Sequence, residues 1–156
     1  MKKKLSVLLL LVGVGFSTFA QSDCETNYAV YRNEYKQKNY EEALKSWRKV
    51  FNECPSYNQN TFANGPKLYQ DKIKKDKANK SAYVDTIMMI YDVRIETFGK
   101  REYVLGLKGA FLLEYDASRF NEAYEMLKVS IDFMGNRTNY MVVVSYFKAL
   151  DKVQKS

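Results

Sequence analysis

The chain has 156 residues, of which 25 are basic, 18 are acidic and none is histidine. This length predicts a single domain. Because the commonest general base and metal ligand is missing, and two cysteines alone cannot complete an ordinary zinc site, we expect no catalytic centre and no metal. The sequence also lacks a phosphate-binding glycine loop, a dinucleotide fingerprint and a nucleophile elbow, so we expect no cofactor and no enzymatic activity.

The N-terminus has the layout of a secretory signal peptide. Lys2 to Lys4 form a positive start, an apolar run extends from Leu5 to Phe16, and small residues lead to Ala20. We predict cleavage after Ala20, because an uncleaved membrane anchor needs about 20 apolar residues and this run is shorter. Residues 1–20 are then a signal peptide, and residues 21–156 form one domain in the periplasm, in the cell envelope or outside the cell, without stable membrane insertion. Loss of three lysines lowers the net charge from +7 to +4, which gives no reason to expect nucleic acid as a partner.

Two helices are predicted at the start of the exported domain, over residues 25–38 and 40–53. Asn39 is expected to cap the second helix, with Glu42 reaching back to it as in a capping box. Pro55 should end this helix, because its ring and missing N–H forbid another turn. The two helices together form a predicted antiparallel hairpin.

The two cysteines flank this predicted hairpin. Each helix has about 13–14 residues and is roughly 20 Å long, so Cys24 before the first helix returns close to Cys54 after the second. In an oxidising compartment a cysteine pair favours a bridge over two thiols. We therefore predict a disulfide between Cys24 and Cys54 with a Cα separation below about 7 Å, the alternative being two unpaired thiols.

A pattern of aromatic, acidic and small residues occurs twice in the chain, 80 residues apart. The matched pairs are Tyr35 with Tyr115, Tyr40 with Phe120, Glu42 with Glu122, and Ala43 with Ala123. Self-similarity of this kind indicates a stack of repeated helical units. We expect an all-α fold, a right-handed helical-hairpin solenoid of about seven antiparallel helices.

The run from Asn39 to Ala43, with the apolar residues and proline that follow it, resembles the second half of a tetratricopeptide repeat. That family places an aromatic, a small residue, a large apolar residue and a closing proline at the positions of Tyr40, Ala43, Trp47 and Pro55. Tyr31 departs from the family, which usually has glycine or alanine there. Residues 114–135 resemble a second copy, with Gly135 in place of the proline. The motif predicts the fold and does not predict an activity.

Five more helices are predicted, over residues 61–77, 81–98, 102–115, 120–134 and 139–153. The first of them either begins at Thr61 and is kinked by Pro66, or opens with Pro66 at its first position. Gly106 and Gly109 lie three residues apart in the helix 102–115, where they allow another helix to approach closely.

The predicted helix 81–98 is apolar around most of its circumference, so we expect it to be packed on both sides. Asp92 and Arg94 lie within it and should pair with groups on neighbouring helices. The stretch from Asp85 to Gly99 resembles a group of exported bacterial repeat proteins without assigned enzymatic activity.

In tetratricopeptide repeats the first helix of each pair lines the concave, ligand-binding face. The resemblance therefore implies a protein or peptide partner bound by Tyr28, Arg32, Tyr35, Lys36, Lys108, Leu112 and Tyr115. Two alternatives remain: a carbohydrate or nutrient binder that uses the tyrosines as stacking platforms, and a structural subunit of an envelope assembly docked through residues 139–153. The helix over those residues lacks the polar face of a terminal cap, so it either closes the fold or contacts a further repeat, a bound protein or a second copy.

Overall fold

The computed structural model describes residues 17–156, with side chains from Asp23 onward. This part of the chain is all-helical and contains no strand. The seven α-helices are α1 (Ser17–Lys36), α2 (Tyr40–Glu53), α3 (Asn60–Lys75), α4 (Lys80–Phe98), α5 (Arg101–Tyr115), α6 (Phe120–Met134) and α7 (Tyr140–Lys155). Two short 3₁₀ turns, η1 (Ala117–Arg119) and η2 (Gly135–Arg137), flank α6.

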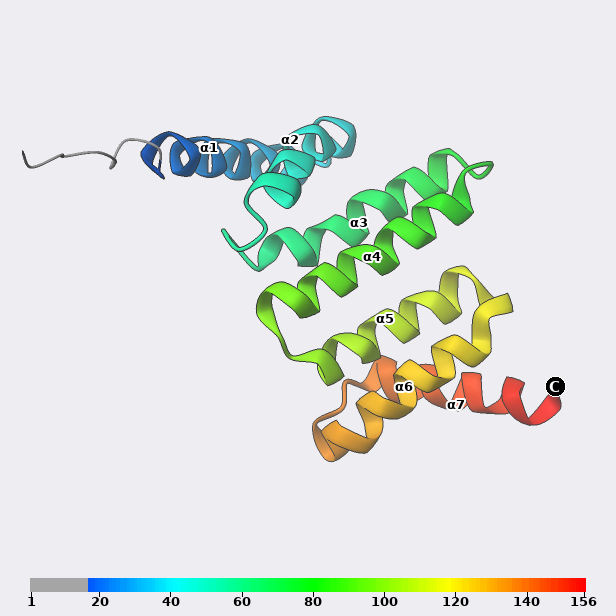
Figure 1. Ribbon diagram of the computed structural model, residues 1–156. Helices are drawn as coiled ribbons and strands as arrows, with labels where there is room; N and C mark the ends of the chain where they lie inside the picture. The colour runs from blue at the N-terminus through cyan, green and yellow to red at the C-terminus, as the bar shows by residue number, and fades with distance from the viewer. Residues whose placement is uncertain (1–16) are drawn as a thin grey trace, which may run out of the picture.

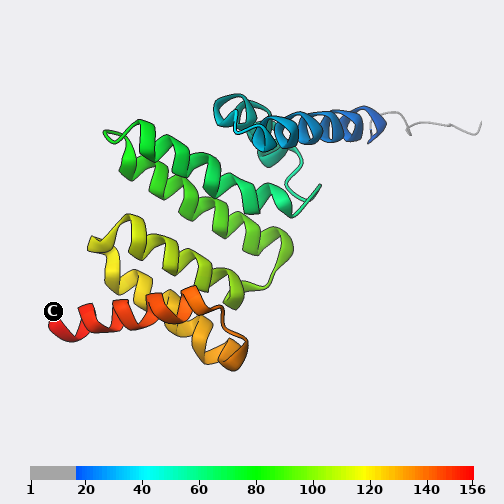
Figure 2. The same ribbon diagram turned by 180° about the vertical axis from the view of Figure 1, so that it is seen from behind.

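The helices form a stack of antiparallel hairpins (Figure 1). The pairs α1 with α2, α3 with α4, and α5 with α6 pack against each other, and α2 with α3, α4 with α5, and α6 with α7 join neighbouring hairpins. The last helix also packs on α5, so α7 rests on both members of the preceding pair (Figure 2). The predicted all-α helical-hairpin architecture is confirmed.

The 80-residue register of the sequence extends over three helices of the structure. The helices α3 and α7 both have 16 residues, and their first and last residues are each 80 positions apart. Ala43 and Ala123 are both fully buried between helices. Trp47 and its counterpart Leu127 fill the core one turn further along. A unit of two hairpins is thus followed by the first three helices of a second unit.

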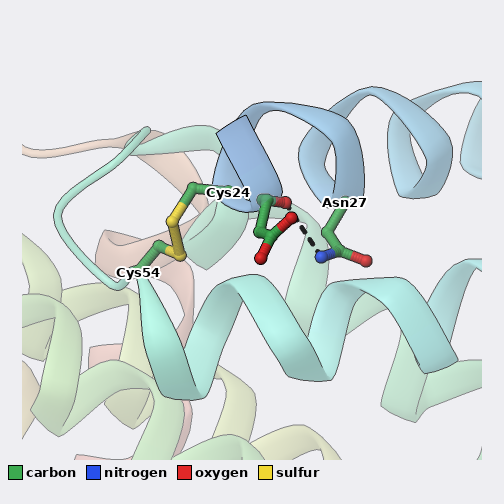
Figure 3. Close-up of a disulfide and its surroundings, with 4 residues drawn as sticks. Cys24, Asn27 and Cys54 are labelled. Atoms are coloured by element: carbon green, nitrogen blue, oxygen red, sulfur yellow. Dashed lines mark hydrogen bonds between the residues drawn. A yellow bond between two sulfur atoms is a disulfide. The ribbon is translucent and has the colours of Figure 1, made fainter. Parts of the chain in front are cut away.

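The predicted disulfide joins Cys24, which lies in α1, to Cys54, which directly follows α2 (Figure 3). The two Cα atoms lie 6.0 Å apart, as the antiparallel geometry requires. Next to the bridge, the Asn27 side chain donates a hydrogen bond of 2.9 Å to the Asp23 carbonyl oxygen. The bridge closes the open end of the first hairpin.

The start of this hairpin differs from the prediction in two details. The first helix begins at Ser17 instead of residue 25 and runs through the expected cleavage position after Ala20. The charged start and apolar run, residues 2–16, lie outside the described residues, so signal cleavage stays a prediction. The capping box is wrong, because the Asn39 side chain donates to Glu34 and makes no cap hydrogen bond, while Glu42 pairs with Lys45.

Pro66 lies inside α3, which begins at Asn60, so the second of the two predicted starts is wrong. The preceding Gly65 lets the ring of Trp47 approach closely, since a Cβ built on it would lie 2.4 Å from the indole Cζ2 atom. The indole nitrogen also donates a hydrogen bond of 2.7 Å to the carbonyl oxygen of Thr61. Trp47 therefore fixes α3 on α2 by both packing and a buried polar contact.

The fourth helix is packed on both sides, by α3 and by α5, as its apolar circumference predicts. Its two internal charged residues contact residues of α5. Asp92 pairs with Lys108, and the Arg94 guanidinium lies 5.8 Å from the ring centre of Tyr103. Gly99 ends the helix with a positive φ of 68°, a conformation that glycine adopts without strain.

The two glycines of α5 permit close contacts between helices of the second unit. A Cβ on Gly106 would lie 2.4 Å from Ser130 Oγ, and one on Gly109 would lie 2.9 Å from the Ala123 carbonyl oxygen. The prediction of close helix approach is confirmed at both positions. The two glycines let α6 pack closely on α5, and a Cβ on Gly106 would also lie 3.0 Å from Val142 Cγ1 of α7.

Candidate partner-binding groove

A groove of about 650 Å³ runs between α5 and α7, with single residues of α3 and α4 at its far side. Most of its lining comes from the first helices of successive pairs, which are the helices that the repeat resemblance places on the ligand face. The lining residues are Gln70, Tyr91, Leu107, Ala110, Phe111, Leu113, Glu114, Asn139, Tyr140, Met141, Val142, Val144, Ser145, Lys148, Asp151 and Lys152.

The two walls are apolar stripes at helical spacing. On α5 the stripe is Leu107, Ala110 and Phe111, and on α7 it is Met141 and Val144. Residues three and four apart lie on one face of a helix, so each stripe presents a continuous apolar surface to the groove. Met141 is 65% exposed, which is unusual for a large apolar side chain in a packed helix.

The rim of the groove carries charges of opposite sign on its two walls. Glu114 stands on α5, and Lys148 and Lys152 stand on α7. None of these three forms an ion pair with another residue of the described chain, whereas Asp151 on the same rim pairs with Lys155. Three unpaired charges thus flank an apolar floor and are available to a ligand.

Tyr91 of α4 contributes a phenol group to the groove. Its ring lies 6.3 Å from that of Phe111, and burial raises the pKa of its hydroxyl to about 12. The phenol therefore stays neutral at physiological pH, and it can donate one hydrogen bond and accept others. It is a polar group of fixed protonation in a largely apolar setting.

The residues predicted on the second unit do not line this groove. Leu112 is completely buried and belongs to the core, so its assignment to a binding surface is wrong. Lys108 is 11% exposed and paired with Asp92 of α4, and Tyr115 is half-buried and stacked on Phe111, with a pKa raised by burial. The helices α1 and α5 are equivalent in the 80-residue register, but α4 packs on α5 and no described helix precedes α1. The face that is open on α1 is therefore covered on α5.

The predicted residues of α1 lie away from the groove, and their accessibility is mixed. Tyr28 is half-buried between Tyr31 and Tyr57, and its hydroxyl accepts a hydrogen bond from Asn60. The ring of Tyr35 packs on that of Tyr40 at 5.5 Å. Lys36 is exposed and Arg32 is half-exposed. The two cations remain open to solvent, while the two tyrosines serve mainly to pack the hairpin.

Comparison with protein-family models and with curated protein sequences gives no match. Within residues 17–156, no group of His, Cys, Asp and Glu side chains could hold a metal ion. In the same part of the chain, none of the helices combines the length and the apolar character needed to cross a bilayer.

The sequence held two signals for the groove that the prediction did not use. Of the α5 residues that line it, those at positions 107, 111, 113 and 114 are each one position away from a predicted residue, which is a turn of about 100° around the helix, and Ala110 is two positions away. The predicted helix over residues 139–153 is strongly apolar, and the structure exposes three large side chains there, Tyr140, Met141 and Phe147.

Proposed function

We propose that the chain is an exported, non-enzymatic interaction module that binds an amphipathic helical segment of a partner protein in the groove between α5 and α7. The observation that supports this most directly is an open apolar groove between two helices, rimmed by unpaired charges. Helix-in-groove recognition uses this combination of an apolar floor and a polar rim.

The dimensions of the groove suit a short helix. Its lining residues along this wall run from Asn139, the N-cap of α7, to Lys152, which corresponds to roughly 20 Å at 1.5 Å per residue. A ligand helix of about three to four turns fits this length. Its apolar face would contact Ala110 and Val144, an acidic side chain would reach Lys148 or Lys152, and a basic one would reach Glu114.

Membership of the tetratricopeptide-repeat class is part of the proposal. It is supported by the hairpin stack, by the buried small residues Ala43 and Ala123 at equivalent positions, and by a groove on the first helices of successive pairs. Export is supported by the Lys2–Ala20 sequence pattern and by the disulfide, since such bridges persist in oxidising compartments.

A second candidate function is that of a structural subunit docked through the outer side of α7. Phe147 on α7 is 62% exposed and does not line the groove. Tyr146 packs edge-on against Phe147, so this side of α7 is an ordered apolar surface. Large exposed apolar side chains of this kind mark contact surfaces in many proteins.

A matched pair of substitutions separates the two surfaces. Val143 and Val144 are neighbours on α7 and are both half-buried, but only Val144 lines the groove. Helical peptides that bind the purified, disulfide-bonded chain would first be selected from a display library of amphipathic sequences. Their affinities for the Val144→Asp and Val143→Asp variants would then be measured by fluorescence anisotropy.

The groove proposal expects Val144→Asp to weaken peptide binding at least about tenfold, because the carboxylate would be desolvated without a partner, and expects Val143→Asp to leave binding nearly unchanged. If Val143→Asp weakens binding and Val144→Asp does not, the peptide binds on the outer side of α7 and the groove proposal is wrong. The charge reversal Arg32→Glu with Lys36→Glu tests the surface first predicted on α1. Loss of binding only in that variant would refute the groove and restore that prediction.

A further inference from the structure

A second cavity lies at the edge of the stack where three connections meet, and it shares no residue with the groove. It has a volume of about 440 Å³, within the range of small-ligand sites. Its walls come from the turn before α3, from α4, from the start of α5 and from the end of α6. The lining residues are Gln59, Arg94, Lys100, Glu102, Tyr103, Phe133 and Met134.

The central feature of this cavity is a guanidinium without an acidic partner. Arg94 forms no ion pair with any residue of the described chain, and its Nε atom is buried without a hydrogen-bond partner. An unsatisfied buried donor is costly, so such groups in folded proteins usually meet a ligand, an ion or an ordered water. The Tyr103 ring, 5.8 Å away, holds the guanidinium from one side.

The residues that line the cavity carry a net charge of +1. Arg94 and Lys100 are positive and Glu102 is the single acidic residue among the lining groups. Glu102 makes only a long contact of 3.9 Å, with Arg101 outside the cavity lining. One added negative charge would therefore neutralise the lining, and a monoanion suits it better than a dianion.

The remaining wall is apolar and open. Phe133 is 61% exposed and Tyr103 is 37% exposed, and both face a cavity that also includes Met134. A ligand that places an apolar ring against Phe133 and Met134 would remove this surface from water, which is favourable in proportion to the area covered. A bare inorganic anion would leave it exposed.

We infer that this cavity binds a small organic monocarboxylate, with the carboxylate on Arg94 and an apolar ring against Phe133. Arginine holds a carboxylate through two parallel N–H···O bonds, and Lys100 adds a second positive charge from the rim. The inference is independent of the peptide groove, because the two sites share no residue and contact different segments of α5.

The test uses benzoate as the probe on the purified full chain, with acetate, sulfate and benzylamine as comparisons. Binding is followed by amide chemical shifts of residues 94–103 in nuclear magnetic resonance titrations. We expect benzoate to bind at least about tenfold more tightly than acetate, which lacks the ring, and more tightly than sulfate. Benzylamine, with the opposite charge, should cause no shifts at this site.

Substitutions then assign the contacts. Arg94→Lys keeps the charge but loses the paired N–H donors, and we expect it to weaken benzoate binding about tenfold or more, because lysine cannot hold a carboxylate through two parallel hydrogen bonds. Phe133→Ala removes an exposed side chain that the fold does not need, so it should weaken benzoate binding while leaving acetate binding and thermal stability unchanged. Should Arg94→Lys fail to fold, Phe133→Ala still decides whether the ring is recognised. The inference is overturned if benzoate binds no better than acetate, if sulfate binds as well, or if both variants bind benzoate like the wild type.

Discussion

The contact between Trp47 and Gly65 gives the sharpest test of how α2 holds α3. A Cβ at position 65 would lie 2.4 Å from the indole Cζ2 atom and 3.0 Å from Cε2, and the indole is a rigid ring that is 1% exposed. Gly65→Ala therefore forces either the ring or the helix to move. Overpacking of this kind typically costs about 1–3 kcal/mol. The better helix propensity of alanine offsets at most about 1 kcal/mol of this.

The second unit of the chain shows how the conflict can be removed. At the equivalent positions, 80 residues later, Leu127 stands for the tryptophan and Ser145 for the glycine. A smaller apolar side chain on α6 thus accompanies a residue with a Cβ on α7. We expect the same exchange to work in the first unit, so that Gly65→Ala is harmful beside Trp47 and tolerated beside leucine.

The experiment is a double-mutant cycle on Trp47→Leu and Gly65→Ala. Unfolding in urea is followed by circular dichroism at 222 nm, because the only tryptophan is lost in half of the variants. We expect Gly65→Ala to lower the free energy of unfolding by about 1–2 kcal/mol in the wild type and to cost at least about 1 kcal/mol less in the Trp47→Leu background. The strain that any side chain before Pro66 adds is present in both backgrounds and cancels in the cycle. Equal costs in the two backgrounds would refute the packing argument.

Three further results are expected. Replacing Cys24 and Cys54 by serine should lower the free energy of unfolding by about 3–4 kcal/mol, as loop closure over 30 residues implies, and an unchanged urea midpoint would contradict this. Burial raises the pKa of Tyr31 and Tyr91 from 10.0 to about 12, so their contribution to stability, present below pH 10, should be lost between pH 10 and 12. Absorbance titration should then show late-ionising tyrosines that disappear in the Phe variants. Gly109→Ala should destabilise the chain by about 1–2 kcal/mol despite its better helix propensity, because the added Cβ meets a backbone carbonyl oxygen at 2.9 Å, and equal thermal melts would argue against it.

The elements of the fold were largely predictable from local sequence patterns. The helix 40–53 has the predicted bounds because apolar residues recur at helical spacing and Pro55 follows. The disulfide follows from the similar lengths of the first two predicted helices together with the expectation of an oxidising compartment. The position of Asn39 suggested a cap that does not form, because the nearby Glu34 offers its side chain a charged acceptor. Caps depend on one side-chain rotamer, which a sequence pattern does not determine.

The candidate site was harder to predict, because exposure depends on which helix packs beside which. The repeat register correctly aligned α1 with α5, yet Leu112 is buried and Arg32, its counterpart, is half-exposed. The difference comes from α4, which covers one side of α5 and has no counterpart beside α1 in the described chain. The 80-residue register therefore predicts burial at core positions, as at Ala43 and Ala123. It predicts exposure at a surface position only where the neighbouring helices also repeat.

The disulfide lies entirely within the first hairpin, and this has a consequence for the order in which the molecule assembles. Apart from the packing of α7 on α5, the helix contacts described above join elements that are consecutive along the chain, so each hairpin can form soon after its second helix has been made. Both sulfur atoms belong to the segment that ends at Cys54, roughly the first third of the polypeptide. We therefore expect oxidation to precede the completion of α5, α6 and α7, and the cross-linked hairpin to offer α3 a preformed surface on which to dock.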